Sequence, residues 1–246
     1  MPDNVSNRLD RERLFHDRQA ADRQSCPRFS EELARPDSWY LDHASWIRFA
    51  VQSLGNVESK TVLDWGCGHG MAACLLAGRG AKVVATDVSA GYCREVRLRA
   101  GIHLVAIRTV QADAVRLPLP DASIDAIWGH AILHHLPFDK AMRELRRVLK
   151  PNGRLVLSDP FEGGFAVRWA RMASGCWNGH QTIDEQPITW HVLNAIKEYF
   201  PEVMATFWDI PGVYSGQLSG CWPDNMRWNH SLARYVLISN HALVSS

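Results

Sequence analysis

The 246-residue sequence lacks the features of several large protein classes. No apolar run approaches the roughly 20 residues of a membrane span, and the charged amino terminus lacks the apolar centre of an export signal. The 27 basic and 26 acidic residues leave a net charge of +1, so a broad nucleic-acid-binding face is not expected. These absences predict a cytoplasmic protein whose partner is neither a membrane nor a nucleic acid, and they leave the oligomeric state open.

Disulfide and metal patterns are missing as well. The six cysteines lie at positions 26, 67, 74, 93, 176 and 221, with no C-x-x-C pair and no Cys/His zinc spacing. Reduced thiols are therefore expected. One polar stretch carries His180, Asp184, Glu185 and His191, but these residues lack the helical spacing of a ligand triad. No metal site is predicted.

The chain does contain an alternation of strand and helix patterns. Short apolar, β-rich runs occur in TVLDW, KVVATD, HLVAIRTV, IDAIWG and RLVLSD. Helices are expected between them over residues 71–77, 90–100 and 139–149, and the last of these ends at the turn PNG (151–153). This order predicts βαβ units and a mostly parallel sheet in an α/β fold.

Both flanks of this core depart from the alternation. Helices are predicted over residues 7–24 and 39–55, ahead of the first strand. Beyond Pro160 we expect an inserted lid over 161–187, then a helix in WHVLNAIKEYF and strands in VMATFWDI and SLARYVLISN. Six of the ten tryptophans occur at or after Trp169. They suit the packing of a small cap as well as an aromatic substrate pocket, and both interpretations stay open.

The stretch VLDWGCGHG (62–70) places three glycines where a strand turns into a helix. Glycines there let a ligand approach the backbone closely and expose the N–H groups of the helix start. A dinucleotide fingerprint would need a glycine in place of Met71, and a phosphate loop would need G-K-[ST], which is absent. Asp64, two residues before the first glycine, would repel a pyrophosphate. It favours a ligand that carries positive charge.

Two further carboxylates follow the next strands. Asp87 ends the second strand, where it is placed to accept hydrogen bonds from both ribose hydroxyls, and Asp113 after the third can accept one from the amine of adenine. Without a ligand, Asp64 would be a turn cap and Asp87 a helix N-cap, but the spacing satisfies all three ligand contacts together. Ribose, adenine and a cationic amino-acid tail describe S-adenosylmethionine.

These segments resemble those of class I S-adenosylmethionine-dependent methyltransferases of the small-molecule type. The resemblance covers about residues 58–160 and rests on D-W-G-C-G-H-G, Asp87, the QADA turn, IDAIWGHAILHHL and L-K-P-N-G-R-L. It implies a Rossmann-like, doubly wound, seven-stranded sheet with an antiparallel last strand. Residues 1–57 would then form helices over the cofactor, 58–160 the cofactor-binding core, and 161–246 a substrate cap with the last strands.

The resemblance also implies cofactor contacts at matching positions. The methionine end would be lined by Asp64, Gly66, Cys67, Gly68 and Gly70. The ribose and adenine would be contacted by Asp87, Val88, Asp113 and Ala114, with the backbone of Gly129, His130 and Ala131 beside the adenosine. Amino-terminal helices cover the methionine end in many such enzymes, so the segment RLFHDRQAADR, with Phe15, His16 and Arg18, and Tyr40 of WYLDH are candidates to close over it. Arg18 and Tyr40 are predicted to contact the cofactor carboxylate.

Methyl transfer from a sulfonium is an in-line displacement that requires neither a metal nor a covalent intermediate. Holding nucleophile, methyl group and sulfur in line can supply about 7–11 kcal/mol, and a base is needed only where the acceptor atom must lose a proton. The candidate bases are three histidines near the end of the fourth strand. His134 is interpreted chiefly as lining the pocket, His130 as a neighbour of the cofactor, and His135 as either a base or a cap.

Three functions stay open on the sequence alone. The leading one is methyl transfer from S-adenosylmethionine to a small-molecule acceptor. The second is a cyclase in which the amine of the cofactor displaces methylthioadenosine to form azetidine-2-carboxylate. The third is a non-catalytic cofactor-binding scaffold, which the intact acids and glycines disfavour.

Overall fold

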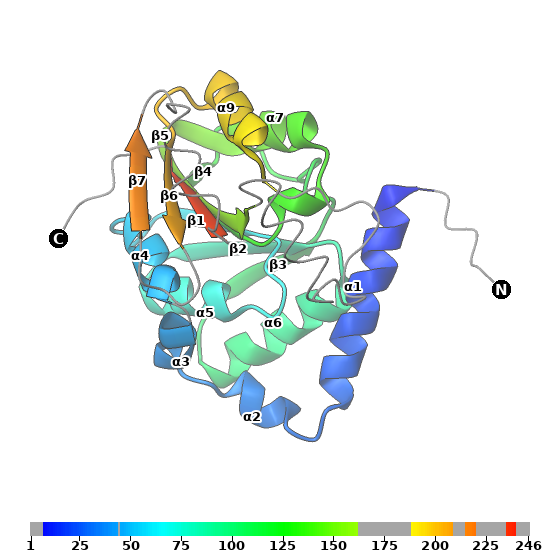
Figure 1. Ribbon diagram of the computed structural model, residues 1–246. Coiled ribbons are helices and arrows are strands. Elements are labelled where there is room, and N and C mark those ends of the chain that lie inside the picture. The colour runs from blue at the N-terminus through cyan, green and yellow to red at the C-terminus, as the bar shows by residue number, and fades with distance from the viewer. Residues whose placement is uncertain (1–6, 44, 162–187, 209–214, 220–234, 240–246) are drawn as a thin grey trace, which may run out of the picture.

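A central sheet with helices on both faces organises the chain (Figure 1). The computed structural model describes residues 7–43, 45–161, 188–208, 215–219 and 235–239. The lid predicted over 161–187 lies outside these ranges except for Phe161, as do Cys176 and Cys221. Within them, no helix has the length and apolar character needed to cross a membrane.

Five parallel strands form the main part of the sheet. They are β1 (Thr61–Trp65), β2 (Lys82–Asp87), β3 (Ile107–Gln111), β4 (Ile124–His130) and β5 (Leu149–Pro160), in the order β3-β2-β1-β4-β5. Each of the five apolar runs forms one of these strands, so the predicted Rossmann-like α/β fold with a mostly parallel sheet is confirmed. The strand order reverses beside β1, and open α/β sheets bind ligands at the carboxyl ends of the strands at such a point.

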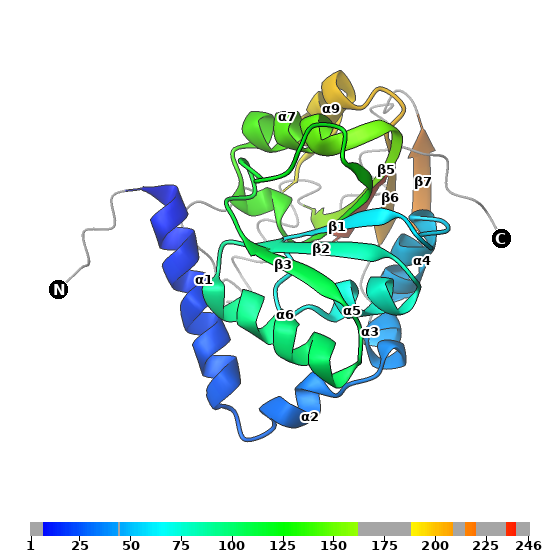
Figure 2. The same cartoon turned by 180° about the vertical axis from the view of Figure 1, so that it is seen from behind.

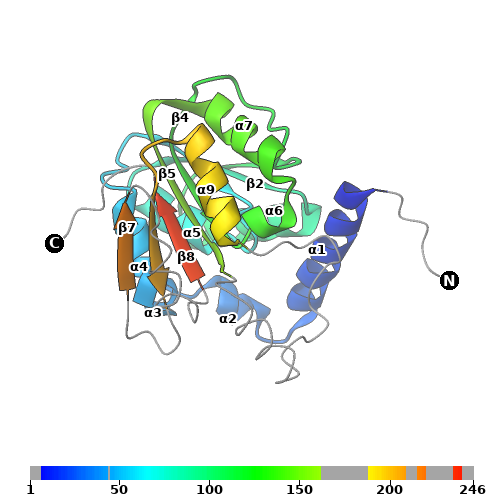
Figure 3. The same ribbon diagram turned by 45° about the horizontal axis from the view of Figure 1, so that its top comes forward.

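Three antiparallel strands extend the sheet beyond β5. These are β6 (Met204–Trp208), β7 (Ser215–Ser219) and β8 (Tyr235–Ser239), and they continue the order as β5-β8-β6-β7. Figure 3 shows β8, β6 and β7 along one side of the molecule. The sheet in the described ranges thus has eight strands where seven were predicted. The additional strand is β7, whose segment SGQLS has a single large apolar residue and carries little strand signal.

Helices cover the two faces of the sheet (Figure 2). On one face lie α7 (Phe138–Val148) and α9 (Trp190–Tyr199), and on the other α4 (Ser45–Ser53), α5 (Met71–Gly78) and α6 (Ala90–Ile102). Successive strand residues point to opposite faces, so Leu63 joins the core on the α7 side and Val62 the core on the α5 side. Because both faces are covered, β1, β2 and β4 are buried over most of their length rather than at alternate residues.

The amino-terminal helices run along the edge of this sandwich. The helix predicted over 7–24 is α1 (Arg8–Ser25), which begins at Asn7, whose side chain accepts a hydrogen bond from the backbone N–H of Asp10. It is followed by α2 (Phe29–Leu33) and α3 (Asp37–His43). The helix predicted over 39–55 is represented by α3 and by α4 (Ser45–Ser53), on either side of residue 44, which lies outside the described ranges.

The turn predicted at PNG lies inside β5 rather than at its start. The pairing of β4 with β5 shifts register there, since Ile124 pairs with Leu149 but Ala126 pairs with Arg154. Asn152 adopts a left-handed conformation with φ 61°. The P-N-G sequence therefore forms an irregularity that the strand pairing accommodates.

Arg99 on α6 is a buried cation that joins three segments. The residue is 1% exposed. Its Nε donates to the carbonyl of His69 at 2.9 Å, and its Nη1 donates to the carbonyls of Glu32 and Leu33 at 2.9 and 3.0 Å. These bonds tie the glycine turn after β1 and the helix α2 to α6, so Arg99 holds the backbone from which the site is built.

Replacing this cation should destabilise the fold. Arg99→Met removes the guanidinium donor from three carbonyls and a neighbouring charge from the buried Glu95, so the free energy of unfolding should fall by about 3–5 kcal/mol. Urea unfolding measures the change. The exposed neighbour Arg97 provides the control, because Arg97→Met should stay within about 0.5 kcal/mol of wild type. Equal, small effects in the two variants would contradict the assigned role of Arg99.

Candidate functional site

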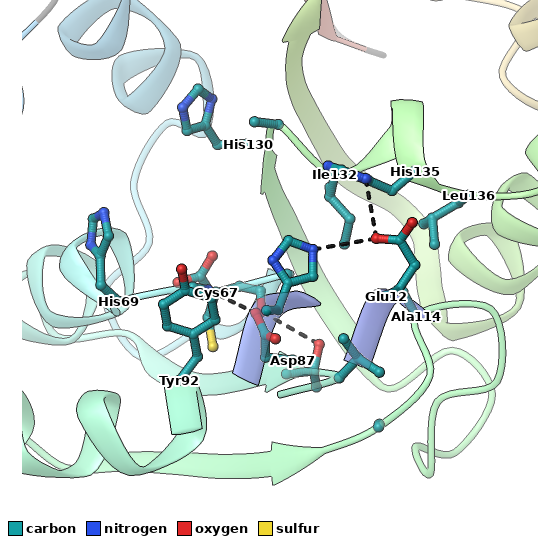
Figure 4. A pocket seen from close by; sticks show the side chains of 18 of the residues that line it. Glu12, Cys67, His69, Asp87, Tyr92, Ala114, His130, Ile132, His135 and Leu136 are labelled. Carbon is teal, nitrogen blue, oxygen red and sulfur yellow. Dashed lines mark hydrogen bonds and ion pairs between the residues drawn. The ribbon is translucent and has the colours of Figure 1, made fainter. Parts of the chain in front are cut away.

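A pocket opens where the carboxyl ends of β1, β2 and β4 meet (Figure 4). Side chains from α1, α3, α6 and the segments that follow these strands complete its wall. Most of the predicted site residues line it, namely Tyr40, Asp64, Gly66, Cys67, Gly68, Asp87, Val88, Asp113, Ala114, His130 and His135. The structure therefore brings together residues that are up to 95 positions apart within the same cavity.

The turn after β1 has the bare backbone that its glycines predict. Gly66, Gly68 and Gly70 have φ values of 69°, 46° and 80°, a region that residues with side chains rarely adopt. A Cβ on Gly68 would meet nothing within 4 Å, whereas one on Gly66 would lie 2.3 Å from Ile132 Cδ1. Gly68 thus borders open space that a ligand can fill, and Gly66 permits close packing against the segment after β4.

Asp87 braces this turn from the end of β2. Its Oδ2 accepts from the N–H of Gly68 and its Oδ1 from the N–H of Ser89, both at 2.9 Å. The side chain that caps α6 is Ser89, which accepts from the N–H of Tyr92, so capping does not account for Asp87. Burial raises the pKa of the Asp87 carboxyl.

Asp64 is the most deeply buried acid of the pocket. Its side chain is 2% exposed, and its Oδ2 has no hydrogen-bond partner in the part of the chain that the structure describes. Burial and then the charge of Asp87 raise the pKa of Asp64 to about 7, against the effect of a backbone hydrogen bond from Ala73. Burial and the charge of Asp64 in turn raise the pKa of Tyr40, whose hydroxyl therefore stays protonated.

Asp113 lines the pocket from the segment after β3. Its Oδ1 accepts from the N–H of Val115 at 3.2 Å and lies 3.5 Å from Nη2 of Arg8. Arg8 also donates to the carbonyl of His135 at 3.2 Å. The start of α1 therefore connects the segment after β3 with the segment after β4.

One face of α1 forms part of the pocket wall. The lining residues Arg8, Glu12, His16 and Gln19 are spaced three or four positions apart and so lie on one side of the helix. His16 belongs to the segment that was predicted to close over the cofactor, but Arg8, Glu12 and Gln19 were not singled out. Their common helical face is the signal that identifies them, whereas Arg18 is not among the lining residues.

Two predicted glycines also lie outside the lining. Gly70 instead precedes α5 as its N-cap, where a Cβ would lie 2.8 Å from Val96 Cγ2. Gly129 lies within β4, where a Cβ would come within 2.7 Å of Leu157 Cδ2. Both positions require glycine because neighbouring side chains approach closely. From the sequence alone, a glycine required by a neighbouring side chain cannot be distinguished from a glycine required by a bound ligand.

His134 was predicted to line the pocket, but it is turned away into the protein. Its Nδ1 lies 2.8 Å from Oδ1 of Asp159, and the same oxygen accepts from the backbone N–H of His134 at 3.2 Å. Asp159 is fully buried near the end of β5. The pair fastens the short 3-10 helix η1 (Leu133–His135) to β5, while His130 and His135 on either side face the pocket.

The pocket residues suit a nucleoside that carries a cation. The unpartnered Oδ2 of Asp64 can accept from an ammonium group, and the space beside Gly68 admits a ligand close to the backbone. Asp87 has further lone pairs for ribose hydroxyls, since a carboxylate accepts about four hydrogen bonds. A pyrophosphate would instead bring its negative charge to two acids in a buried site. These residues therefore fit S-adenosylmethionine and do not fit a dinucleotide.

Comparison with known proteins agrees with this geometry. Residues 63–157 match the family described as "Methyltransferase domain". The demethylmenaquinone methyltransferase of Thermus thermophilus is 34% identical over 128 residues, which are 50% of this chain and 58% of that protein. The fatty-acid O-methyltransferase of Mycolicibacterium smegmatis is 37% identical over 163 residues, which are 61% of this chain and 57% of that protein. The matched region thus spans less than two-thirds of either relative.

Solved structures share the fold. A geranyl diphosphate C-methyltransferase from Streptomyces coelicolor A3(2), in complex with Mg²⁺, geranyl diphosphate and S-adenosyl-L-homocysteine, superposes with a TM-score of 0.66 at 16% identity and covers 96% of this chain and 98% of that one. The chain carries a class I S-adenosylmethionine-dependent methyltransferase domain. The enzyme class and the cofactor predicted from the sequence are thereby confirmed for this domain, whereas the roles of single residues stay predictions.

The buried Asp64 of the methyltransferase pocket lowers the free energy of unfolding when it is ionised, and the variant Asp64→Asn measures this effect. The pKa of Asp64 is about 7 in the folded chain and 3.8 as the ordinary value, so its ionisation destabilises the ligand-free fold progressively between those two pH values. The neutral Asn removes this penalty. At pH 8 the free energy of unfolding should therefore rise by up to roughly 4 kcal/mol.

Urea unfolding at pH 5 and pH 8 measures this gain, which should shrink at the lower pH because less of the penalty has developed there. Asp125 is a matched control, since it is a half-buried acid paired with Lys150 at 2.7 Å and its pKa is lowered. Asp125→Asn should lower stability at pH 8. An Asp64→Asn variant that is less stable than wild type at pH 8 would contradict the assignment of an unsatisfied buried carboxylate.

Proposed function

We propose that the chain transfers the methyl group of S-adenosylmethionine to a small-molecule acceptor by in-line displacement. The observation that carries this proposal is the pair of acids at the glycine turn. Asp64 has a buried oxygen without a partner in the described ranges, and Asp87 is braced beside it by two backbone N–H groups. Together they favour a phosphate-free nucleoside with a cationic tail.

Each part of the cofactor has a proposed partner. Asp64 accepts from the ammonium group and the protonated Tyr40 hydroxyl donates to the carboxylate. Asp87 accepts from the ribose hydroxyls, and Asp113 accepts from the adenine amine, with Val88 and Ala114 beside it. Bound S-adenosylmethionine supplies an already activated methyl group, so the residues of the chain need to orient the reactants and exclude water.

The acceptor is proposed to be a small organic molecule, as the names of the menaquinone and fatty-acid enzymes related to this domain indicate for those proteins. His130 and His135 both face the pocket and are the candidates for taking a proton from an acceptor that must lose one. In Figure 4, His130 lies across the pocket from Glu12 and His135. His134 is proposed to position η1 through Asp159 instead.

The larger architecture is proposed to follow the family. Residues 1–57 cover the cofactor, 58–160 bind it, and 161–246 supply the acceptor side and the last strands. The contribution of α1 and α3 to the pocket wall supports the first part of this division. Within the sheet, we assign β8, paired antiparallel with β5 and β6, as the counterpart of the antiparallel last strand, and β7 as an addition at the edge.

Product analysis tests this function against the two alternatives. The purified chain is incubated with S-adenosylmethionine, with and without a panel of hydroxylated and carboxylated metabolites. Methyl transfer predicts S-adenosylhomocysteine that forms only when an acceptor is present. Methylthioadenosine formed without any acceptor would identify a cyclase instead, and binding without either product across the panel would favour a scaffold.

A further inference from the structure

Three potential metal ligands from two distant segments meet in the wall of the pocket. Glu12 and His16 lie one turn apart on α1, and His135 lies in η1 after β4. One ligand atom of each residue falls within 4.8 Å of those of the other two. All three residues line the pocket, and Figure 4 shows Glu12 and His135 side by side, joined by a dashed line.

The distances suit a single ion held between them. Oε2 of Glu12 lies 3.4 Å from Nε2 of His16 and 3.2 Å from Nδ1 of His135. Zinc binds imidazole nitrogen and carboxylate oxygen at about 2.0–2.2 Å, so neighbouring ligands of a tetrahedral site are roughly 3.3–3.5 Å apart. The same carboxylate oxygen therefore has two imidazole neighbours near the separation that a shared ion requires.

The orientation of His16 is fixed by a hydrogen bond on its other nitrogen. Its Nδ1 lies 3.1 Å from Oε1 of Gln19, an oxygen that also accepts from the hydroxyl of Tyr92 at 3.3 Å. An amide oxygen only accepts, so Nδ1 carries the hydrogen, and in the neutral ring the lone pair of Nε2 is directed toward Glu12. Histidines that bind metals typically have such an outer hydrogen bond, which fixes the ring and its tautomer.

The carboxylate among the three ligands is buried. The Glu12 side chain is 3% exposed, and a buried carboxylate is costly unless cations or hydrogen bonds compensate it. In its neutral form each of the two imidazoles provides a lone pair and no charge. A cation between the three groups would neutralise the carboxylate and use the lone pairs at once.

We propose that Glu12, His16 and His135 bind a divalent transition-metal ion of the zinc or cobalt class, with a coordination position open to the pocket. Two imidazoles and one carboxylate are a common ligand set for such ions. The ion fastens α1 to η1 over the pocket, and it makes His135 a ligand rather than a proton acceptor. The sequence predicted no metal site, because Glu12 and His16 on α1 are more than a hundred residues away from His135 in the sequence.

Metal titration tests the site without cofactor or acceptor, so its outcome is separate from that of the proposed methyl transfer. The full chain, without a histidine tag and dialysed against a chelator, is titrated with Co²⁺ by visible absorption and with Zn²⁺ in competition. Wild type should bind one equivalent. Glu12→Gln, His16→Asn and His135→Asn should each weaken binding by more than the roughly 10–100-fold that loss of an outer hydrogen-bond partner causes, and Gln19→Leu should fall within that range.

The control is His103→Asn, because the His103 ring contacts the carbonyl of Leu33 away from the pocket. This variant should bind the ion as tightly as wild type does. Circular dichroism verifies the fold of each variant. The ligands come from two elements, α1 and η1, so if one variant fails to fold, the metal affinities of the other variants still test the proposal. Absence of binding, or equal binding by wild type and all three ligand variants, would overturn the proposal and leave a protonated imidazole as the partner of Glu12.

Discussion

A buried carboxylate with an unused oxygen is the constraint on which the pocket depends. Asp64 ends up there because β1 is a central strand covered on both faces, so a side chain near its carboxyl end is removed from water. Nothing in the described residues satisfies Oδ2. Burial and then the charge of Asp87 raise the pKa of the group to about 7. This position therefore favours a cationic ligand, and in the absence of a ligand the buried carboxylate lowers the free energy of unfolding.

The rest of the site is arranged around that acid. Asp87 holds the N–H of Gly68, which keeps the turn open beside Asp64, and Arg99 holds the carbonyl of His69 from behind. The helix α1 then crosses the open side and contacts the segments after β3 and β4 through Arg8. Rigid strands position the acids, and an amino-terminal helix encloses the space between them, so the residues that select the ligand and those that cover it come from different parts of the chain.

The sequence predicted what is encoded locally. Five apolar runs with helices between them indicate a parallel sheet, and the acids at the ends of β1 and β2 follow from their positions within one strand–turn–helix unit. The misplaced residues depend on tertiary contacts. His134 turns away because Asp159 lies beside it, Gly129 is required by Leu157, and Gly70 by Val96. The wall formed by α1 was only partly foreseen, since the sequence does not indicate which face of a polar helix meets the pocket.

Calorimetric titration of the ligand-free chain with S-adenosylmethionine and, separately, with NAD tests the central claim most directly. If the acids beside the glycine turn select a cationic nucleoside over a pyrophosphate, S-adenosylmethionine should bind with one equivalent while NAD gives no binding heat. Binding of NAD together with no response to S-adenosylmethionine would contradict this account of the pocket.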